Sequence, residues 1–399
     1  MRPSRGAWIC AFLSLIGFAL AAYLTYLHYG LLRGEFLGGA ACGGGTFNCH
    51  AVTGGRWASW LGMPVSLWGA FGYLLALGLS LLARQSAQWA EAAFTLLAGL
   101  ALAFMAVDLY LLYLMAAVIR NFCLFCLFTY AVNLGLLVAA ASSIGRPWPQ
   151  ALGGFGAALG WLRPTAARPA AWLFWGIALS GLLATAGVHA TSVFLTRGPA
   201  GAVRTQIRDY VARQSRVALD VAGDPTLGRA DASIQIVEFS DFLCPACQQA
   251  SKMNAILLAN YRSDVTLVFK NYPLDSTCNS RVPQPVHPGA CYLAAALECA
   301  NLQGKFWPFH DLVFHDPKHY VPSRMEEDAL RLGLDVARFR SCIDSGQGMA
   351  AVKQDIEQAA VANVNRTPTY VINGVPIAGG LTPATFDDLV AVLKETGGR

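Results

Sequence analysis

The sequence predicts a bundle of membrane-spanning α-helices followed by a soluble α/β domain. Of its 399 residues, 55% are hydrophobic and only 13% are charged, which is too apolar for an ordinary soluble protein. Residues 1–199 hold ten Arg, no Lys and three acidic residues, a net charge of +7. Residues 200–399 hold 19 basic and 21 acidic residues, a net charge of −2. An apolar, basic half therefore precedes a half of mixed charge.

Five apolar stretches are long enough to cross a membrane, which takes about 20 residues as a helix. The first stretch follows Arg2 and Arg5, but its apolar run is long and lacks a small-residue cleavage site, so we expect a retained helix. We expect a four-helix core within residues 1–145, a linker over 146–170 and a fifth helix over 171–196. The five stretches cover residues 8–29, 62–83, 90–118, 122–141 and 171–195.

The arginines in the short loops predict which side of the membrane each loop faces. With the N-terminus in the cytoplasm, six of these arginines are cytoplasmic and three are outside, which favours this orientation. The fifth helix then delivers the soluble half to the outside, where disulfides persist. Because the arginines lie at the ends of apolar runs, the overall charge of +5 does not indicate nucleic-acid binding.

Two cysteine pairs lie on the outer side of the predicted bundle. Cys42 and Cys49 belong to the first external loop, and Cys123 and Cys126 lie one turn apart at the external mouth of the fourth helix. Pairs on one side of the membrane can exchange disulfides. Cys42–Cys49 as a purely structural disulfide remains an alternative. The unequal spacing of the pairs, one of them on a membrane helix, argues against a zinc site, so we expect no metal.

A third cysteine pair follows a predicted strand in the soluble half. Residues 233–240 form this strand, and Cys244-Pro-Ala-Cys247 leads into a helix over 248–261. The helix N-terminus favours a thiolate, so Cys244 is the expected nucleophile and Cys247 the resolving thiol. A strand over 265–270 and a late Asn-Gly hairpin complete a domain over residues 231–399, after a lead-in over 197–230.

Four further cysteines accompany several helices between Cys247 and the late hairpin. The helices are expected over residues 290–301, 307–314, 324–332 and 350–361. An even number of cysteines in an external domain indicates structural disulfides. Because Cys278 and Cys291 enclose a short Pro-rich loop, we favour Cys278–Cys291 with Cys299–Cys342 over the two other pairings.

Together, these features resemble the vitamin K epoxide reductase family. The resemblance rests on the four-helix core, the loop cysteine pair, Met-Pro-Val-Ser-Leu-Trp-Gly at residues 63–69 and the Cys-x-x-Cys that opens the fourth helix. The chain is similar to bacterial fusions in which a fifth helix leads to an external thioredoxin-like domain. This resemblance implies a quinone, ubiquinone or menaquinone, beside Cys126, with Ser66 near the active disulfide and the quinone. It also implies that Cys123 exchanges with Cys49 and that Cys42 meets the soluble domain.

The soluble half resembles the thioredoxin fold, and its helical insertion resembles that of DsbA-type oxidases. The resemblance implies that Pro368 is the cis proline beside the reactive sulfur. Glu238 matches the buried acidic position behind Cys247, where a raised pKa would suit proton transfer. Many DsbA-type proteins have Pro-His between the cysteines, whereas this chain has Pro-Ala, which weakens the expectation of a very strong oxidant.

The expected function is that of a membrane thiol oxidase in the bacterial inner membrane. It would form disulfides in exported proteins with reduced cysteines and pass their electrons through Cys244/Cys247, Cys42/Cys49 and Cys123/Cys126 to the quinone pool. We expect lipid around the bundle, and no nucleic acid as a partner. A thiol reductant carrier or disulfide isomerase is the alternative, and it would need a redox cysteine reachable from the cytoplasm, where only Cys10 lies nearby.

Asp108 is an acidic residue within the third apolar stretch. A carboxylate is costly in lipid, so its side chain should face the interior of the bundle. Both a proton relay toward a quinone and a hydrogen-bonded structural role fit this residue.

Overall fold

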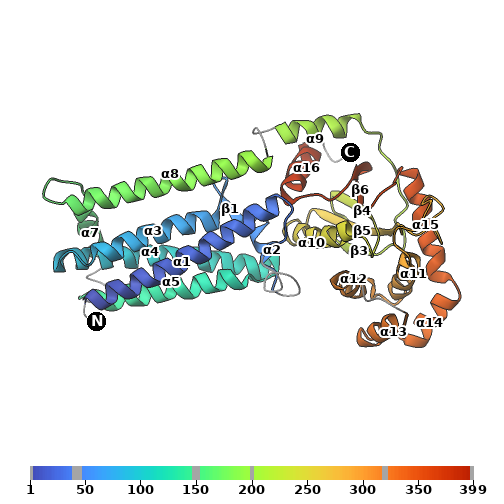
Figure 1. The fold of residues 1–399 in the computed structure, drawn as a ribbon, viewed down its shortest axis with the longest axis horizontal. Helices are drawn as coiled ribbons and strands as arrows, with labels where there is room; N and C mark the ends of the chain where they lie inside the picture. The colour runs from blue at the N-terminus through green and yellow to red at the C-terminus, as the bar shows by residue number, and fades with distance from the viewer. Residues whose placement is uncertain (1–2, 38–46, 146–152, 198–201, 317–321, 396–399) are drawn as a thin grey trace. The chain divides into compact units, whose positions relative to one another are not determined.

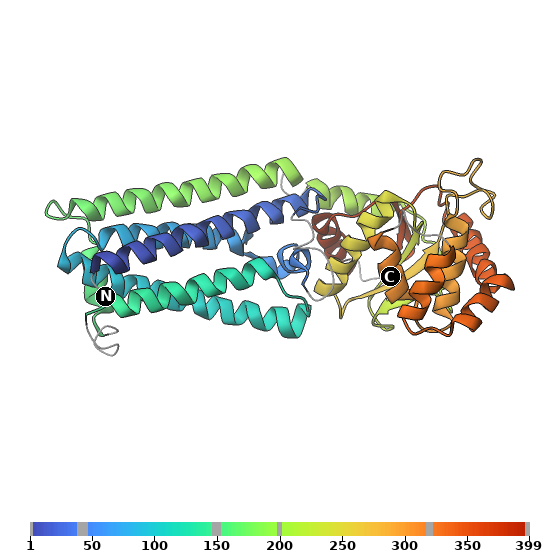
Figure 2. The same ribbon diagram turned by 60° about the horizontal axis from the view of Figure 1, so that its bottom comes forward.

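The structure is a computed structural model that describes residues 3–37, 47–145, 153–197, 202–316 and 322–395 (Figures 1 and 2). The chain divides into two compact units, Met1–Ala200 and Gly201–Arg399. Cys42 lies outside the described residues.

The first unit contains five long apolar helices, each of a length and composition that can cross a membrane. All five stretches predicted from the sequence are confirmed as helices. Helix α1 begins five residues earlier than its predicted stretch. The helices are α1 (Pro3–Leu32), α3 (Val65–Leu82), α4 (Ala87–Tyr113), α5 (Leu124–Ser143) and α8 (Pro169–Arg197).

Four of these helices form the core of the bundle. Helix α1 packs against α3 and α5, α4 packs against α5 and α3, and α8 runs along α3 (Figures 1 and 2). Cys10 is fully buried in this core, which agrees with a role as a small apolar side chain. Tyr73 donates a hydrogen bond to Asn133, and Asn133 donates one to Asp108, so the acidic side chain faces the interior as expected.

Short elements connect the long helices. Between α1 and α3 lie the short helix α2 (Cys49–Thr53) and the 3-10 turn η2 (Arg56–Ala58). A small hairpin of β1 (Ser59–Trp60) and β2 (Met63–Pro64) follows them. The stretch 146–170, expected as a linker, contains the helix α7 (Phe155–Trp161).

Helix α4 does not end as a regular α-helix. It continues as the π-helix η3 (Leu114–Ile119), and Arg120 then adopts a left-handed backbone with φ of 58°. A π-helix widens the backbone spiral and often occurs at functional sites. Here it changes which side chains at the end of α4 face the neighbouring helices.

The second unit is built on a five-stranded mixed sheet with strand order β3-β5-β4-β6-β7. Strands β4 and β5 are parallel, and every other pairing is antiparallel. The Asn373-Gly374 turn joins β6 to β7 with positive φ at both residues, which is the backbone that this dipeptide favours. The strands are β3 (Thr226–Gly228), β4 (Ile234–Ser240), β5 (Val265–Asn271), β6 (Thr369–Ile372) and β7 (Val375–Ala378).

Helices flank this sheet and also form an insertion between β5 and β6. The stretch 197–230, expected to be a linker and lead-in, contains α9 and β3, so part of it belongs to the folded domain. The insertion holds five helices, one more than the sequence predicted, because α14 was not recognised. The helices are α9 (Ala202–Arg213), α10 (Pro245–Asn260), α11 (Ala290–Asn301), α12 (Phe306–His315), α13 (Pro322–Arg331), α14 (Val336–Asp344), α15 (Gln347–Val361) and α16 (Pro383–Glu395).

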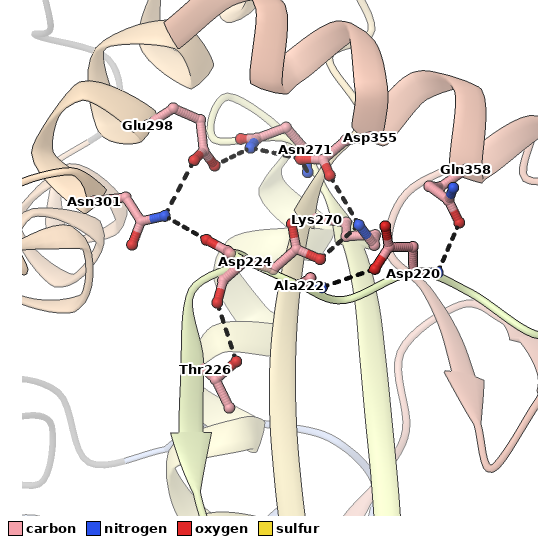
Figure 3. Close-up of polar contacts among 11 residues, drawn as sticks. Asp220, Ala222, Asp224, Thr226, Lys270, Asn271, Glu298, Asn301, Asp355 and Gln358 are labelled. Carbon is pink, nitrogen blue, oxygen red and sulfur yellow. Dashed lines mark hydrogen bonds and ion pairs between the residues drawn. The ribbon is translucent and has the colours of Figure 1, made fainter. Parts of the chain in front are cut away.

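A buried polar network joins the insertion to the end of β5 (Figure 3). Lys270 Nζ lies 2.6 Å from an oxygen of Asp224 and 3.1 Å from one of Asp355. Asn271 donates hydrogen bonds from its side chain to Glu298 and Asp355. Burial alone would lower the pKa of Lys270, but the two carboxylates outweigh burial and raise it. The network therefore places a stable cation inside the domain.

Candidate redox sites

Cys123 and Cys126 form a disulfide at the start of α5. Cys123 is the N-cap of this helix, and its Sγ accepts a hydrogen bond from the backbone N–H of Cys126 at 3.2 Å. The backbone N–H of Cys123 in turn contacts Met115 Sδ at 3.4 Å, on the π-helix η3. Cys123 is fully buried, whereas Cys126 is half-buried. The two sulfurs therefore differ in access although they share one turn.

Cys49 lies beside this disulfide in the fold. Cys49 and Cys123, both fully buried, belong to one apolar cluster that also contains Leu24, Leu27 and Met115. The segments that precede the two cysteines are also joined through the backbone, because the N–H of Asn48 donates to the carbonyl of Phe122 at 3.0 Å. The structure thus brings one cysteine of the loop pair to the membrane disulfide.

A cavity of about 80 Å³ opens on the Cys126 side of this site. Its walls are mainly apolar and come from α1, α2, η2, α3, the end of α4 with η3, and the start of α5. A few polar groups interrupt them, which is typical of pockets for small organic ligands. The lining residues are Leu24, His28, Val52, Thr53, Trp57, Ala58, Val65, Ser66, Leu111, Leu114, Met115, Ile119, Cys126 and Tyr130.

Two polar groups of the cavity wall are fixed by hydrogen bonds to neighbouring elements. Ser66, which the sequence placed near the disulfide, lines the same cavity as Cys126 and accepts a hydrogen bond from the Thr25 hydroxyl at 2.9 Å. His28 Nδ1 lies 2.6 Å from the carbonyl oxygen of Thr53. The sequence analysis left His28 and Tyr130 out of the candidate site, because a lone polar residue in an apolar helix gives no signal of its position.

The soluble unit places Cys244 and Cys247 at the start of α10. The helix begins at Pro245, three residues earlier than predicted, because proline is favoured at the first helical position. Cys244 is its N-cap and is 7% exposed, whereas Cys247 is fully buried. Thr367–Pro368 is a cis peptide, and the Thr367 carbonyl oxygen lies 3.7 Å from Cys244 Sγ. The cis proline expected at position 368 is therefore present, and the carbonyl of the preceding residue lies beside the reactive sulfur.

The pKa values of the two sulfurs shift in opposite directions. Hydrogen bonding from Cys247 and from the backbone N–H groups at the start of the helix lowers the pKa of Cys244 to about 5, against the opposing effect of burial. Burial raises the pKa of Cys247 well above its usual range, and the nearby Cys244 raises it further. At neutral pH Cys244 is thus the thiolate and Cys247 the thiol, as a nucleophile and a resolving cysteine require.

Glu238 lies behind Cys247, on β4, and is 1% exposed. Its Oε2 accepts a hydrogen bond from Asn254 at 2.6 Å, and Asn254 accepts one from the Tyr370 hydroxyl. Burial raises the pKa of Glu238 to about 7, and its charge raises the pKa of Cys247. Glu238 therefore does not face solvent, and its carboxyl group can hold or release a proton near neutral pH.

The remaining four cysteines form two disulfides in the insertion. Cys278 pairs with Cys291, and Cys299 pairs with Cys342, the arrangement that the sequence analysis favoured. The second disulfide packs in the same apolar cluster as Cys244 and Cys247. The first closes a loop whose chain passes beside the active site. The sequence analysis missed one residue of this loop, His287, whose Nδ1 lies 3.0 Å from Asp241 Oδ2.

Comparison with known families agrees with both halves of this description. Residues 8–141 match the vitamin K epoxide reductase family. Residues 220–393 match a thioredoxin family. The chain joins a vitamin K epoxide reductase domain to a thioredoxin-like domain. The first match lies within the unit of long apolar helices, and the second lies within the unit built on the mixed sheet.

Individual relatives share only part of this architecture. The chain is 35% identical over 158 residues to the Na(+)/H(+) antiporter NhaA 3 of Salinispora tropica, across 40% of this chain and 23% of the antiporter. It is 30% identical over 171 residues to the antiporter NhaA of Herminiimonas arsenicoxydans, across 43% and 25%. The match thus spans about a quarter of the length of these curated relatives, and antiport is the activity named for those proteins.

Two solved structures are similar to part of the chain. Oxidised BdbD of Bacillus subtilis is 21% identical with a TM-score of 0.38, and the match covers 46% of this chain and 98% of BdbD. For alpha-DsbA1 of Wolbachia pipientis the values are 18% and 0.38, over 45% of this chain and 94% of that protein.

Proposed function

We propose that this protein is a membrane thiol oxidase that forms disulfide bonds in exported proteins and transfers their electrons to a quinone. The observation that carries the proposal is the cavity beside the Cys123–Cys126 disulfide, with Cys126 in its wall and Cys49 in the cluster behind it. In this proposal the N-terminus is cytoplasmic, the membrane is the bacterial inner membrane, and the soluble unit works outside the cytoplasm.

The cavity suits a quinone, either ubiquinone or menaquinone. Its wall is largely apolar, as a ring system with an isoprenoid tail requires, and its few polar groups include Ser66, His28 and Tyr130. Ser66 and Tyr130 carry hydroxyls that can donate hydrogen bonds to quinone oxygens. The bound quinone would supply an acceptor for two electrons and two protons.

The first exchange takes place in the soluble unit. A substrate thiolate attacks the oxidised Cys244–Cys247 pair, and a second substrate thiol completes the substrate disulfide, which leaves Cys244 and Cys247 reduced. Attack at Cys244, the more exposed sulfur, breaks the Cys244–Cys247 bond and releases Cys247, which takes up a proton because of its high pKa, and Glu238 is positioned to supply that proton. The second substrate thiolate then attacks the substrate sulfur of the mixed disulfide and releases Cys244, whose low pKa makes it a good leaving group.

The next exchanges move the electron pair toward the cavity. The Cys244 thiolate attacks the Cys42–Cys49 disulfide at Cys42, and Cys247 then resolves the mixed disulfide. Cys49, released as a thiolate, attacks Cys123, which breaks the Cys123–Cys126 bond and frees the Cys126 thiolate at the cavity wall. Cys42, left as a thiol when Cys247 resolved the first mixed disulfide, then attacks Cys49, which re-forms the Cys42–Cys49 disulfide and releases Cys123. Cys123 and Cys126 now hold the electron pair that a quinone would accept. Each step breaks one S–S bond and forms another, so two electrons travel with each exchange.

The test measures quinol formation by the purified full-length protein in lipid nanodiscs, with a reduced unfolded protein as substrate. Short-chain ubiquinone and short-chain menaquinone are supplied separately. We expect substrate-dependent quinol from wild type and from the control Cys10→Ala, whose side chain is buried in the helix core away from the cavity wall. Cys126→Ala and Cys244→Ala should abolish it.

One outcome of this experiment would overturn the proposal. If wild type forms no quinol while Cys244 still exchanges disulfides with glutathione, the oxidase proposal is wrong. A thiol reductant carrier or disulfide isomerase then becomes the better hypothesis.

A further inference from the structure

The loop between Cys278 and Cys291 brings a histidine to an aspartate that lies shortly before the Cys-x-x-Cys motif in the sequence. His287 Nδ1 lies 3.0 Å from Asp241 Oδ2, and Asp241 is three residues before Cys244. The backbone carbonyl of Asp241 accepts a hydrogen bond from the N–H of Cys244, and its own N–H contacts Cys247 Sγ at 3.5 Å. Asp241 is therefore bonded to both reactive cysteines and to the histidine.

The position of His287 is fixed from several directions. The backbone N–H groups of Val286 and His287 both donate to the carbonyl of Leu274, at 2.8 and 3.0 Å. Two residues later, the N–H of Gly289 donates to the Asp275 carboxylate at 2.8 Å. The Cys278–Cys291 disulfide closes the loop around these contacts. A side chain held in this way loses little freedom when it interacts with a reacting group.

The surroundings of His287 favour its charged form. The Asp241 side chain is fully buried, and its two oxygens accept hydrogen bonds from the N–H groups of Leu243 and Leu274. Among the residues that the structure describes, His287 is the only basic side chain paired with this carboxylate. A carboxylate at hydrogen-bond distance favours the protonated form of a histidine.

The protonated side chain lies beside the residue whose backbone carbonyl accepts a hydrogen bond from the N–H of Cys244. The hydrogen bond to Asp241 raises the pKa of His287 against the opposing effect of burial, and the charges of Asp241 and Cys244 add to the shift. These two groups, one after β4 and the other at the start of α10, are the charged neighbours that act on the histidine. The dipeptide between the cysteines, Pro245-Ala246, offers no charged side chain of its own.

We propose that His287 supplies the cation of this active site: held by Asp241, its imidazolium stabilises the Cys244 thiolate and makes the Cys244–Cys247 disulfide easier to reduce. His287 is a positioning residue in the loop and takes no part in bond exchange. The inference rests on the thiol chemistry of the proposed function, but it needs neither the direction of electron flow nor the quinone.

The charge pair exists only within a window of pH. Cys244 is a thiolate above its pKa of about 5, and His287 is a cation below its own pKa, which is raised from the usual value. As pH rises through the pKa of His287, the imidazole becomes neutral and its stabilisation of the thiolate is lost. Replacing the histidine with a permanent cation should remove this upper limit.

The test follows the alkylation rate of Cys244 against pH in the reduced full-length protein, resolved by site with mass spectrometry. All variants carry Cys42→Ser, so that the soluble unit cannot pass electrons to the membrane cysteines and the result does not depend on the oxidase proposal. At pH 4.5, below the Cys244 pKa of about 5, the rate is proportional to the thiolate fraction. We expect His287→Gln to slow alkylation roughly three- to tenfold there.

Two further variants separate charge from structure. His287→Arg keeps a cation and should restore the rate to within about twofold of the parent, with a profile that no longer changes near the histidine pKa. Val286→Ala alters the neighbouring exposed side chain of the same loop and should leave the profile unchanged. A His287→Gln profile that overlays the parent would overturn the proposal. So would an equal loss in His287→Gln and His287→Arg, because it would indicate a steric role.

Discussion

The two Cys-x-x-Cys motifs share a local geometry and differ in their surroundings. In both, the first cysteine is the N-cap of an α-helix, and the second lies one turn inside. Around Cys123 and Cys126 the neighbours are Met115, leucines and an apolar cavity. Around Cys244 and Cys247 they include buried carboxyl groups, a histidine and the carbonyl beside a cis proline.

This difference shows that the motif alone does not determine the chemistry. At the soluble site, hydrogen bonding lowers the pKa of Cys244 and burial raises the pKa of Cys247, with the nearby Glu238 adding to the second shift. The membrane site instead gives its second cysteine access to a cavity. The first arrangement suits exchange with proteins in water, and the second suits delivery of electrons to an apolar acceptor.

The largest expected effect comes from removing the buried sulfur of the membrane motif. In Cys123→Ser, Cys49 has no disulfide to attack, so quinol formation should fall to background while Cys244 keeps its wild-type rate of exchange with glutathione. The matched variant Cys126→Ser keeps Cys123 and, after mild oxidation, should accumulate a Cys49–Cys123 cross-link detectable by peptide mass spectrometry. A cross-link of Cys49 to a sulfur other than those of Cys42 and Cys123 would contradict this order of exchange.

The charged interior of the soluble unit should be costly to disrupt. Lys270→Met leaves the Asp224 and Asp355 carboxylates buried beside an apolar side chain, which should destabilise the domain by about 3–5 kcal/mol. Hydrogen exchange of the β5 and α15 peptides in the full-length protein measures this loss. Arg340→Met, which breaks an exposed pair with Glu326, should leave the stability of the domain nearly unchanged. Similar losses of stability in Lys270→Met and Arg340→Met would contradict the expectation that the buried ion pairs contribute more than the exposed one.

Glu238 should control the resolving cysteine through its protonation. Its pKa of about 7 leaves the carboxyl group neutral below that pH and ionised above it, where it can accept the Cys247 proton. Attack by Cys247 on a mixed disulfide at Cys244 should therefore accelerate as pH rises through 7. Glu238→Gln should slow this step on the order of a hundredfold at pH 8 and remove the inflection, as followed by quenched-flow alkylation. An inflection that persists in the variant would assign it to another group.

The smallest effect is expected at the cavity wall. Ser66→Ala removes one hydroxyl that can bond a quinone, a loss of about 1 kcal/mol or roughly fivefold in KM, with kcat nearly unchanged. Ser80→Ala is the matched control, because that hydroxyl bonds only to the Ala76 carbonyl of its own helix in the interior. Equal KM values for Ser66→Ala and Ser80→Ala would indicate that the Ser66 hydroxyl does not bind the quinone.

Sequence patterns were sufficient for features that depend on local composition. Long apolar runs located the five helices, and an Asn-Gly dipeptide located the hairpin turn of β6 and β7. Cys244 at a helix start and a cis Pro368 followed from the motif and from resemblance to a known fold. These features are encoded within a few neighbouring residues, so a single sequence reveals them.

Other features depend on contacts between distant segments, and no local pattern of residues indicates such contacts. Lys270 ends a predicted strand, and nothing in its neighbourhood indicates that Asp224 and Asp355 enclose it. His287 lies 46 residues from Asp241, and its partner emerges only when the loop folds over the start of α10. The π-helix after α4 was missed because its apolar composition matches that of a regular membrane helix.

The disulfide between Cys278 and Cys291 has a consequence for the biogenesis of the protein. It closes the loop that holds His287 against Asp241, so the active site takes its final form only after another thiol pair in the same chain has been oxidised. Under the proposed function, a newly made copy thus begins as a client of the chemistry that it later performs. In a cell, mature copies would be the natural source of that first oxidation, so that each generation of the protein prepares the next.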